Sequence, residues 1–110
     1  MRPGKLNKEV VFQKYEEISD GQGGHTRKWK DVKKMLAAVV PLNGRELFEA
    51  QKTSSEIEMR VETRWDPDLT RDMRIIYRGQ QLTIQYMIDP EEDQAQLHSL
   101  CKKEGRVSEV

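Results

Sequence analysis

The chain of 110 residues is long enough for one domain, and its hydrophobic fraction of 35% allows only a modest core. Nineteen Lys and Arg side chains balance nineteen Asp and Glu side chains, so the net charge gives no overall attraction to nucleic acid or to an anionic membrane. No apolar run approaches the roughly 20 residues of a membrane-spanning helix. The polar start of the chain is also unlike a secretory signal, so we expect no membrane partner.

The first segments of the chain predict a loose arm followed by a strand. Residues 1–8 are polar and contain proline and glycine, which predicts an N-terminal arm without regular structure. Residues 9–18 alternate in polarity and predict the first strand, with Val10 and Phe12 on one face.

A glycine-rich segment over residues 19–24 then gives the strongest turn signal in the sequence. Glycine adopts positive φ at little steric cost, so three glycines within four residues predict a mobile hairpin tip. No Lys-Ser or Lys-Thr pair and no apolar helix follow the glycines, which argues against a phosphate-binding loop.

The second predicted strand, residues 25–32, has few apolar side chains and should be an edge strand or a surface ribbon. Its cations surround a tryptophan and form a candidate basic ribbon: Arg27, Lys28, Trp29 and Lys30, continued by Lys33 and Lys34. Such cations can follow phosphates while the indole stacks on a base, so a small nucleic-acid-binding barrel of the oligonucleotide-binding kind is the alternative function. We favour a solvated ribbon, because the net charge is zero and only 6% of the residues are aromatic.

A strand and a short helix are predicted next. The apolar run over residues 35–40 is typical of a strand that is covered on both faces, and Pro41 ends it. Asn43 can cap a helix, and Glu46 stands three positions later, which is the spacing of a capping box. The predicted helix spans about residues 43–52 and is too short to be stable without packing on the rest of the chain.

Three further strands follow the helix in the sequence. Residues 57–65 alternate strictly in polarity, while residues 73–78 and 82–88 flank a sharp turn at Gly79 and predict a hairpin. We expect the alternating strands to supply two walls of the core: Ile57, Met59, Val61 and Trp65 on one side, and Leu82, Ile84 and Tyr86 on the other.

The last element, residues 94–103, fits both a helical stripe and an alternating strand. We favour a final strand that closes the sheet, followed by a frayed tail over residues 105–110. Short strands separated by turns and interrupted once by a helix predict a mainly β protein, a small six- to seven-stranded β-barrel with one inserted helix. We expect this barrel to be a single domain over residues 1–110.

No set of residues indicates catalysis, a metal or a cofactor. The acidic turn over residues 89–93 lacks the ligand spacing of a calcium loop. His25, His98 and Cys101 are too scattered to predict a zinc site. Cys101 is the only cysteine, which excludes an internal disulfide, and we interpret it as a small apolar residue rather than a nucleophile. We therefore expect neither enzymatic activity nor a cofactor.

Several segments of the chain, each a weak signal alone, together form an order and spacing that are more specific for one protein family. They are the glycine-rich turn leading to Trp29, residues 37–47 with Ala50 and Gln51, residues 59–65, and residues 73–79 leading to 82–84 and to Asp89-Pro90. In this order the chain resembles the phage head-tail joining family, the small head-completion or stopper proteins of tailed-phage necks. Asn43 stands where that family often has serine, and both residues can cap a helix.

The resemblance implies a structural role in the virion. Copies would form a ring with portal or adaptor ring proteins on the head side and a tail-completion or tail-tube protein on the tail side. Packaged DNA would lie nearby without sequence readout, and the ring would help to retain it. The implied location is the virion neck, after assembly in the host bacterial cytoplasm. The glycine-rich turn becomes a candidate inter-subunit or channel loop: Ser19, Asp20, Gly21, Gln22, Gly23, Gly24 and His25. We expect the isolated protein to be mainly monomeric and to form a ring only on a preassembled portal-side surface.

Overall fold

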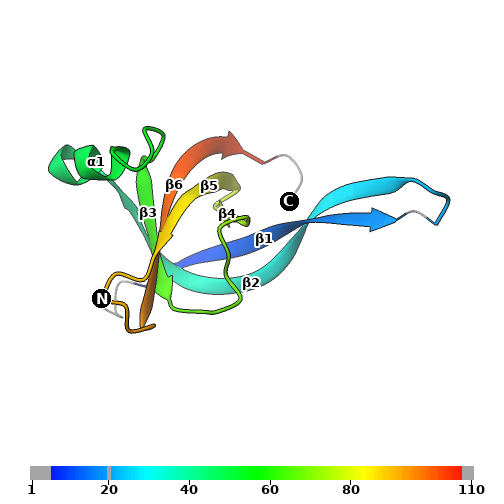
Figure 1. Cartoon of the computed structure of the whole chain (residues 1–110), viewed down its shortest axis with the longest axis horizontal. Coiled ribbons are helices and arrows are strands. Elements are labelled where there is room, and N and C mark those ends of the chain that lie inside the picture. Colours follow the sequence, from blue (N-terminus) through cyan, green and yellow to red (C-terminus); the bar gives the residue numbers. More distant parts are fainter. Residues whose placement is uncertain (1–5, 20, 108–110) are drawn as a thin grey trace.

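A computed structural model describes residues 6–19 and 21–107 of the chain. Six strands close into an antiparallel barrel in the order β1-β2-β3-β6-β5-β4, and one helix lies outside it (Figure 1). The elements are β1 (Lys8–Ser19), β2 (His25–Pro41), α1 (Gly44–Gln51), β3 (Met59–Arg64), β4 (Arg74–Tyr77), β5 (Gln80–Ile88) and β6 (Gln96–Arg106). The predicted mainly β fold with one short helix is confirmed.

The core forms where the alternating faces of the strands meet inside the barrel. Its fully buried side chains come from every strand, as Val10 and Phe12 of β1, Ala37 of β2, Val61 of β3, Ile75 of β4, Leu82 of β5 and Cys101 of β6. The prediction that Val10 and Phe12 share one face of the strand is confirmed, and that face is the core face. Each of the Val, Leu, Ile and Phe side chains stabilises the fold by about 1.5–3 kcal/mol when it leaves water, so the barrel alone supplies a continuous core.

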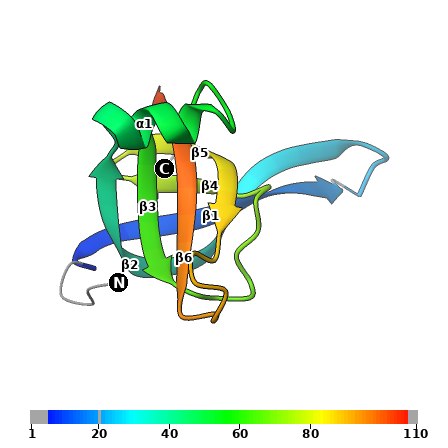
Figure 2. The ribbon, with the colours of Figure 1, turned by 60° about the vertical axis from the view of Figure 1, so that its left-hand side comes forward.

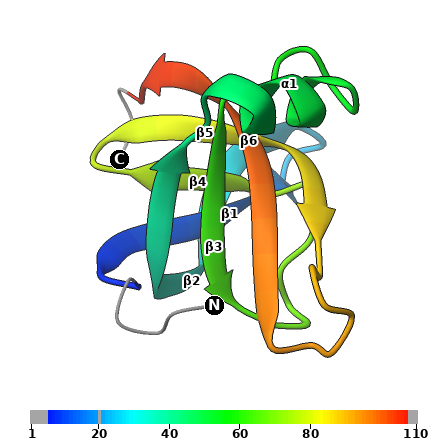
Figure 3. The same cartoon turned by 90° about the vertical axis from the view of Figure 1, so that its left-hand side faces the viewer.

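A second, smaller cluster explains the position of the helix. α1 lies across one end of the barrel, above β3 and β6 (Figures 2 and 3). Its Leu47 and Ala50 pack against buried side chains from the barrel end and its connections: Leu42, Ile57 and Leu100. An eight-residue helix is unstable alone, so this contact holds it in place.

The distal parts of β1 and β2 leave the barrel as a two-stranded ribbon, defined here as residues 14–31. β1 pairs with β4 only over Val11–Gln13, and beyond that point β2 is its sole partner. The ribbon projects along the longest axis, so the molecule measures 52 × 27 × 24 Å (Figure 1). The radius of gyration of 15.0 Å accordingly exceeds the value of about 13 Å for a compact chain of this length.

The predicted division between the strand of residues 25–32 and that of residues 35–40 is wrong, because β2 is one continuous strand. The pairing with β1 steps from Phe12↔Lys33 to Gln13↔Asp31, which leaves Val32 as the extra residue of a bulge. The bulge bends the strand while the ladder continues. The bulge explains why the pattern of polar and apolar residues changes near Val32, which the sequence alone suggests is a break between two strands.

Two predicted burials are also wrong. The sequence predicts that Leu36 is covered on both faces of its strand, yet it is 55% exposed, because it alternates with the buried Ala37 and lies on the outer face of the barrel. Tyr86 was expected to face the core, yet it is 40% exposed. The register shifts between Ile84 and Tyr86, so the bulged Gln85 turns the next side chain outward.

The chain ends differ from their predictions within the described residues. Residues 6 and 7 have no regular structure, as predicted, but Leu6 is buried and β1 already begins at Lys8, so the predicted loose arm is wrong at Leu6 and Lys8. Residues 1–5 lie outside the described part. The C-terminal element is the expected strand, but β6 continues to Arg106 and the predicted tail is wrong over residues 105–106. Residues 108–110 lie outside the described part of the chain.

Candidate assembly surfaces

The ribbon is a solvated strand pair whose cations are largely balanced by its own acids. Arg27 Nε lies 3.9 Å from Glu17 Oε2, and Lys30 Nζ lies 3.8 Å from Glu16 Oε2. His25 Nδ1 lies 3.3 Å from the other oxygen of Glu17. These neighbouring carboxylates offset the positive charge that would follow a phosphate backbone, which weakens the nucleic-acid interpretation of the basic ribbon.

Lys33 and Lys34 do not extend the basic ribbon into one continuous basic patch. Lys33 Nζ donates to carboxylates of the β3–β4 connection, Asp66 and Asp68, so it lies against the barrel. The hydrogen bond with Asp66 raises the pKa of Lys33 and lowers the pKa of Asp66. Lys34 Nζ lies 3.5 Å from Glu9 Oε1 on the neighbouring strand.

The candidate loop forms the tip of the ribbon, farthest from the barrel (Figure 1). Gly21 and Gly23 have φ values of 81° and 85°, which L-residues rarely adopt, so the glycines are required for this turn. Gly21 N donates to Ser19 Oγ at 3.3 Å, and the described residues around it are mostly exposed. Asp20, which the sequence also assigns to this loop, lies outside the described residues. The loop is therefore placed where neighbouring molecules can reach it.

At the root of the ribbon, which is the point where β1 and β2 leave the barrel, three side chains form an aromatic and cationic stack. The rings of Tyr15 and Trp29 lie 4.8 Å apart at an interplanar angle of 10°. The guanidinium carbon of Arg74, from β4, lies 4.2 Å from the ring centroid of Trp29. Stacking and cation–π contacts each stabilise such an arrangement by about 0.5–1.5 kcal/mol. Trp29, assigned to the basic ribbon from sequence, thus contacts the barrel.

A chain of hydrogen bonds also connects the root of the ribbon to the barrel. Arg74 Nε donates to Gln13 Oε1 at 2.8 Å, and Gln13 Nε2 donates to Asp31 Oδ1 at 2.8 Å. Arg74 Nη1 donates to Gln81 Oε1 at 2.7 Å. Gln13 and Arg74 are 7% and 6% exposed, so the bond between them is shielded from water, while the bonds to Asp31 and Gln81 are part-buried. The network holds the base of the ribbon at a fixed place on the barrel.

Sequence reasoning missed this network. The pairing of Arg74 with Gln13 joins residues 61 positions apart, and no local spacing announces it. The available signal was Arg74 itself, a charge between the apolar Met73 and Ile75 in a strand whose other residues predict burial. A buried cation requires partners, so its position could have pointed to a polar cluster.

The helix side of the molecule carries a second surface. Phe48 is 57% exposed on α1, and the ammonium of Lys52 lies 5.0 Å from its ring centroid. A shallow hollow of about 460 Å³ lies between these side chains and Ser55. The helix that lines it lies at the opposite end of the long axis from the tip of the ribbon (Figure 1).

The start of α1 confirms the predicted helix but not the predicted bond. Asn43 occupies the N-cap position with extended backbone, φ −151° and ψ 169°, yet its side chain makes no capping hydrogen bond to the described residues. Glu46 pairs instead with Arg60 of β3, which also donates to Glu62 Oε2 at 2.7 Å. Burial lowers the pKa of Arg60, but the two carboxylates outweigh this and raise it overall. The capping-box bond is wrong because Glu46 has a stronger, charged partner.

The described residues hold no group of three His, Cys, Asp or Glu side chains that could bind a metal ion. Cys101 is fully buried, and burial raises the pKa of its thiol to about 12, so its interpretation as a small apolar residue is confirmed. Burial also lowers the pKa of His98. Within the same described residues, no helix has the length and apolarity to cross a membrane.

A filled barrel with a rigidly based projecting ribbon is the architecture of a small structural subunit, whose outer surfaces are suited to contacts with other molecules. The chain belongs to the phage head completion protein family, whose profile matches residues 1–104. Head completion protein gp16 of Bacillus phage SPP1 is 38% identical to it over 74 residues, which are 67% of this chain and 68% of that protein.

Two solved structures share the fold. Protein SF1141 from Shigella flexneri 2a, solved in solution, has a TM-score of 0.76 at 22% identity, with 94% of this chain and 97% of that chain covered. A chain in the virion of a native gene transfer agent particle has a TM-score of 0.60 at 17% identity, with the same coverage. These two structures show that the fold is shared. Membership of the head completion protein family gives the protein a structural role in the phage head–tail region and a location in the virion.

Proposed function

We propose that copies of this chain form a ring in the virion neck, with portal or adaptor proteins on the head side and a tail-completion or tail-tube protein on the other. The ring would join the DNA-filled head to the tail and help to retain the packaged DNA, which lies nearby without sequence readout. Assembly would take place in the host bacterial cytoplasm. The observation that carries the proposal is the ribbon of residues 14–31, which projects from a complete barrel and contributes little to its core.

The exposure and charge of the ribbon support an assembly role. Tyr15 and Ile18 are 48% and 46% exposed, although large apolar side chains usually gain by burial. Glu16 and Glu17 lie between them and are opposed by Lys28 and Arg27 of β2. This mixture of charges suits complementary contacts with several neighbours better than a permanent apolar interface. The candidate loop, residues 19–25, sits at the tip and is the part that would order against a neighbouring subunit or against the channel.

We further propose that the ring forms on a template. Ordering a flexible tip costs about 1–2 kcal/mol per residue, so two isolated copies gain too little to stay together. A portal-side surface that holds many copies at once raises their effective concentration and offsets this cost. We therefore expect the isolated protein to be mainly monomeric.

Sedimentation of the purified protein at micromolar concentration tests the template requirement. We expect a monomer alone and, after incubation with heads that lack this protein, a ring that remains bound to the heads. A stable ring formed without any partner contradicts the template requirement. Failure to bind to heads at all contradicts the proposed function.

The role of the loop is tested by replacing residues 20–24 with a two-residue Asn-Gly turn, which hairpins favour and which joins the opposed Ser19 and His25 without a change of register. The variant should fold with an unchanged barrel but should fail to join heads to tails in cells infected by a phage without its own copy of the gene. Normal numbers of infectious particles would remove the loop from the mechanism.

A further inference from the structure

A cleft at the root of the ribbon has the chemistry of a site for an acidic segment. It has a volume of about 420 Å³ and is lined by the Tyr15–Trp29 stack and by three cations, Arg27, Lys28 and Arg74. The hydrogen bonds of Arg74 to Gln13 and Gln81 fix one wall of the cleft before anything binds. A preformed site with fixed cations loses little entropy on binding.

Lys28 distinguishes this cleft from the rest of the ribbon. Arg27 and Lys30 each have a glutamate of the ribbon within 4 Å. Among the described residues, no carboxylate lies within ion-pair distance of Lys28, although its ladder partner is Glu16. The cleft therefore keeps positive charge that the ribbon has not neutralised, beside a Tyr15 ring that is 48% exposed.

The complementary surface is the acidic turn between β5 and β6, which the proposed function does not otherwise use. Its backbone is fixed internally, because Asp89 Oδ2 accepts from Gln94 N at 2.9 Å and Asp93 Oδ1 accepts from Ala95 N at 3.1 Å. Glu91 and Glu92 are exposed, and within the described part of the chain no cation pairs with them. The turn thus exposes two carboxylates and Pro90 on a loop that its own hydrogen bonds hold in shape.

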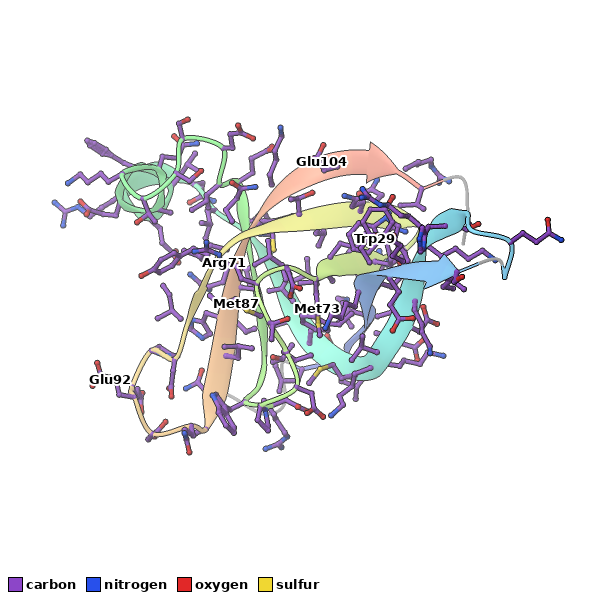
Figure 4. All side chains as sticks on the ribbon, turned by 45° about the vertical axis from the view of Figure 1, so that its right-hand side comes forward. Trp29, Arg71, Met73, Met87, Glu92 and Glu104 are labelled. Atoms are coloured by element: carbon purple, nitrogen blue, oxygen red, sulfur yellow. The ribbon has the colours of Figure 1, made fainter. Side chains whose placement is uncertain are left out.

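Position decides which molecule can bring the turn and the cleft together. Glu92 and Trp29 lie on opposite sides of the molecule, and the turn and the ribbon leave the barrel in different directions (Figures 1 and 4). One copy therefore cannot place its own turn in its own cleft. Two different patches that fit each other make a head-to-tail contact, which generates a ring when the rotation closes.

We infer that the cleft of Arg27, Lys28, Trp29 and Arg74 binds the acidic turn of a second copy of this chain. The carboxylates of Glu91 and Glu92 meet the cations, and Pro90 packs on the exposed aromatic face, as proline does in aromatic-lined grooves. This inference rests on the proposed function, because it supplies the contact between neighbours in the ring.

A charge exchange tests the contact in a phage without its own copy of the gene, complemented by variants. Lys28→Glu and Glu92→Lys should each lower the yield of infectious particles about tenfold or more, because each brings like charges together. The chain with both changes restores opposite charges and should return the yield to within about threefold of the unaltered protein. Lys14→Glu, an exposed ribbon cation outside the cleft, is the matched control and should have little effect.

The remaining outcomes separate the alternatives. Thermal melting of each variant shows whether it folds, and the double variant controls for any unrelated effect of either single change. Single variants with normal yields overturn the inference. Loss of yield without recovery in the double variant also overturns it, and assigns the cleft to another virion protein or to DNA. In both cases the ring itself stands, whereas unaltered protein that fails to restore infection contradicts the proposed function.

Discussion

β1 and β2 contribute to both the barrel and the ribbon, but their side chains are buried in one region and exposed in the other. Within the barrel, β1 buries Val10 and Phe12 completely, and it is paired on both sides over Val11–Gln13. Beyond Gln13 the same strand has one partner and exposes Tyr15 and Ile18. The first half of the strand therefore serves stability, while the second half is free to serve contacts. Substitutions in the ribbon can therefore alter the assembly surface without altering the fold, provided that the contacts at the root stay in place.

The largest contrast should come from placing a charge in each region. Val61→Asp puts an unpaired carboxylate in a fully buried position and should lower the free energy of unfolding by about 4 kcal/mol or more. Ile18→Asp, at a 46% exposed ribbon position, should change it by less than about 0.5 kcal/mol. Chemical denaturation measures both. Similar losses in the two variants would show that the ribbon belongs to the folded core.

The root should respond between these extremes. Arg74→Met leaves Gln13 Oε1 and Gln81 Oε1 without the donors seen here and should cost about 2 kcal/mol. It should also speed amide hydrogen exchange along residues 14–31, because the base of the ribbon is then less firmly held. The exposed Arg27→Met is the control and should leave exchange at the root unchanged. Slow exchange in the ribbon of Arg74→Met would contradict the role of the network.

The barrel interior should make the stability of the molecule depend on pH in the alkaline range. Burial raises the pKa of the Cys101 thiol from 9.0 to about 12, so the thiol ionises in the unfolded chain before it ionises in the folded one. Its contribution to stability is complete below pH 9 and is lost as the pH rises from 9 toward 12, by about 1.4 kcal/mol per pH unit within that window.

The difference between the unaltered protein and Cys101→Ala isolates this contribution from that of other groups. Urea unfolding at pH 8 and pH 10 should show that the unaltered protein loses more stability than the variant. Equal losses in both proteins would indicate that water reaches the thiol.

The smallest effects should come from the exposed polar contacts. Lys30→Ala removes a solvated ion pair with Glu16 and should cost less than about 1 kcal/mol. Asn43→Ala should also cost less than about 0.5 kcal/mol, because its side chain makes no capping bond here. Thermal melts at matched salt concentrations measure both. A loss of about 1–2 kcal/mol for Asn43→Ala would indicate that the cap forms in solution.

The sequence was informative where one local rule decides the structure. The period-2 alternation around Val61 predicts both the strand and its buried face, and Pro41 and Gly79 mark ends of elements that the structure keeps. It failed at the bulges, because one extra residue such as Gln85 reverses the alternation and turns Tyr86 outward. A count of spacings contains no sign of such an insertion.

The candidate site was predictable only in part. The glycine tip and the basic strand around Trp29 are visible in the sequence as a turn and a charge pattern. The pairing of Arg27 with Glu17 requires the strand register, and the contact between Arg74 and Trp29 requires the closed barrel. Charge balance and root rigidity are therefore tertiary properties, which explains why the nucleic-acid alternative looked stronger before the contacts were known.

The central claim is that the ribbon is dispensable for folding and required for joining heads to tails. Glu16 and Lys28 are opposed in the ladder, so an Asn-Gly turn can connect them and remove the distal ribbon while it keeps the Tyr15–Trp29 stack. The direct measurement is the yield of infectious particles that this shortened chain restores, with its melting temperature taken in parallel. The shortened chain should melt within about 4 °C of the unaltered protein. It should restore no infectious particles, and electron micrographs should show separate heads and tails. Normal particle yields from the shortened chain would contradict the central claim.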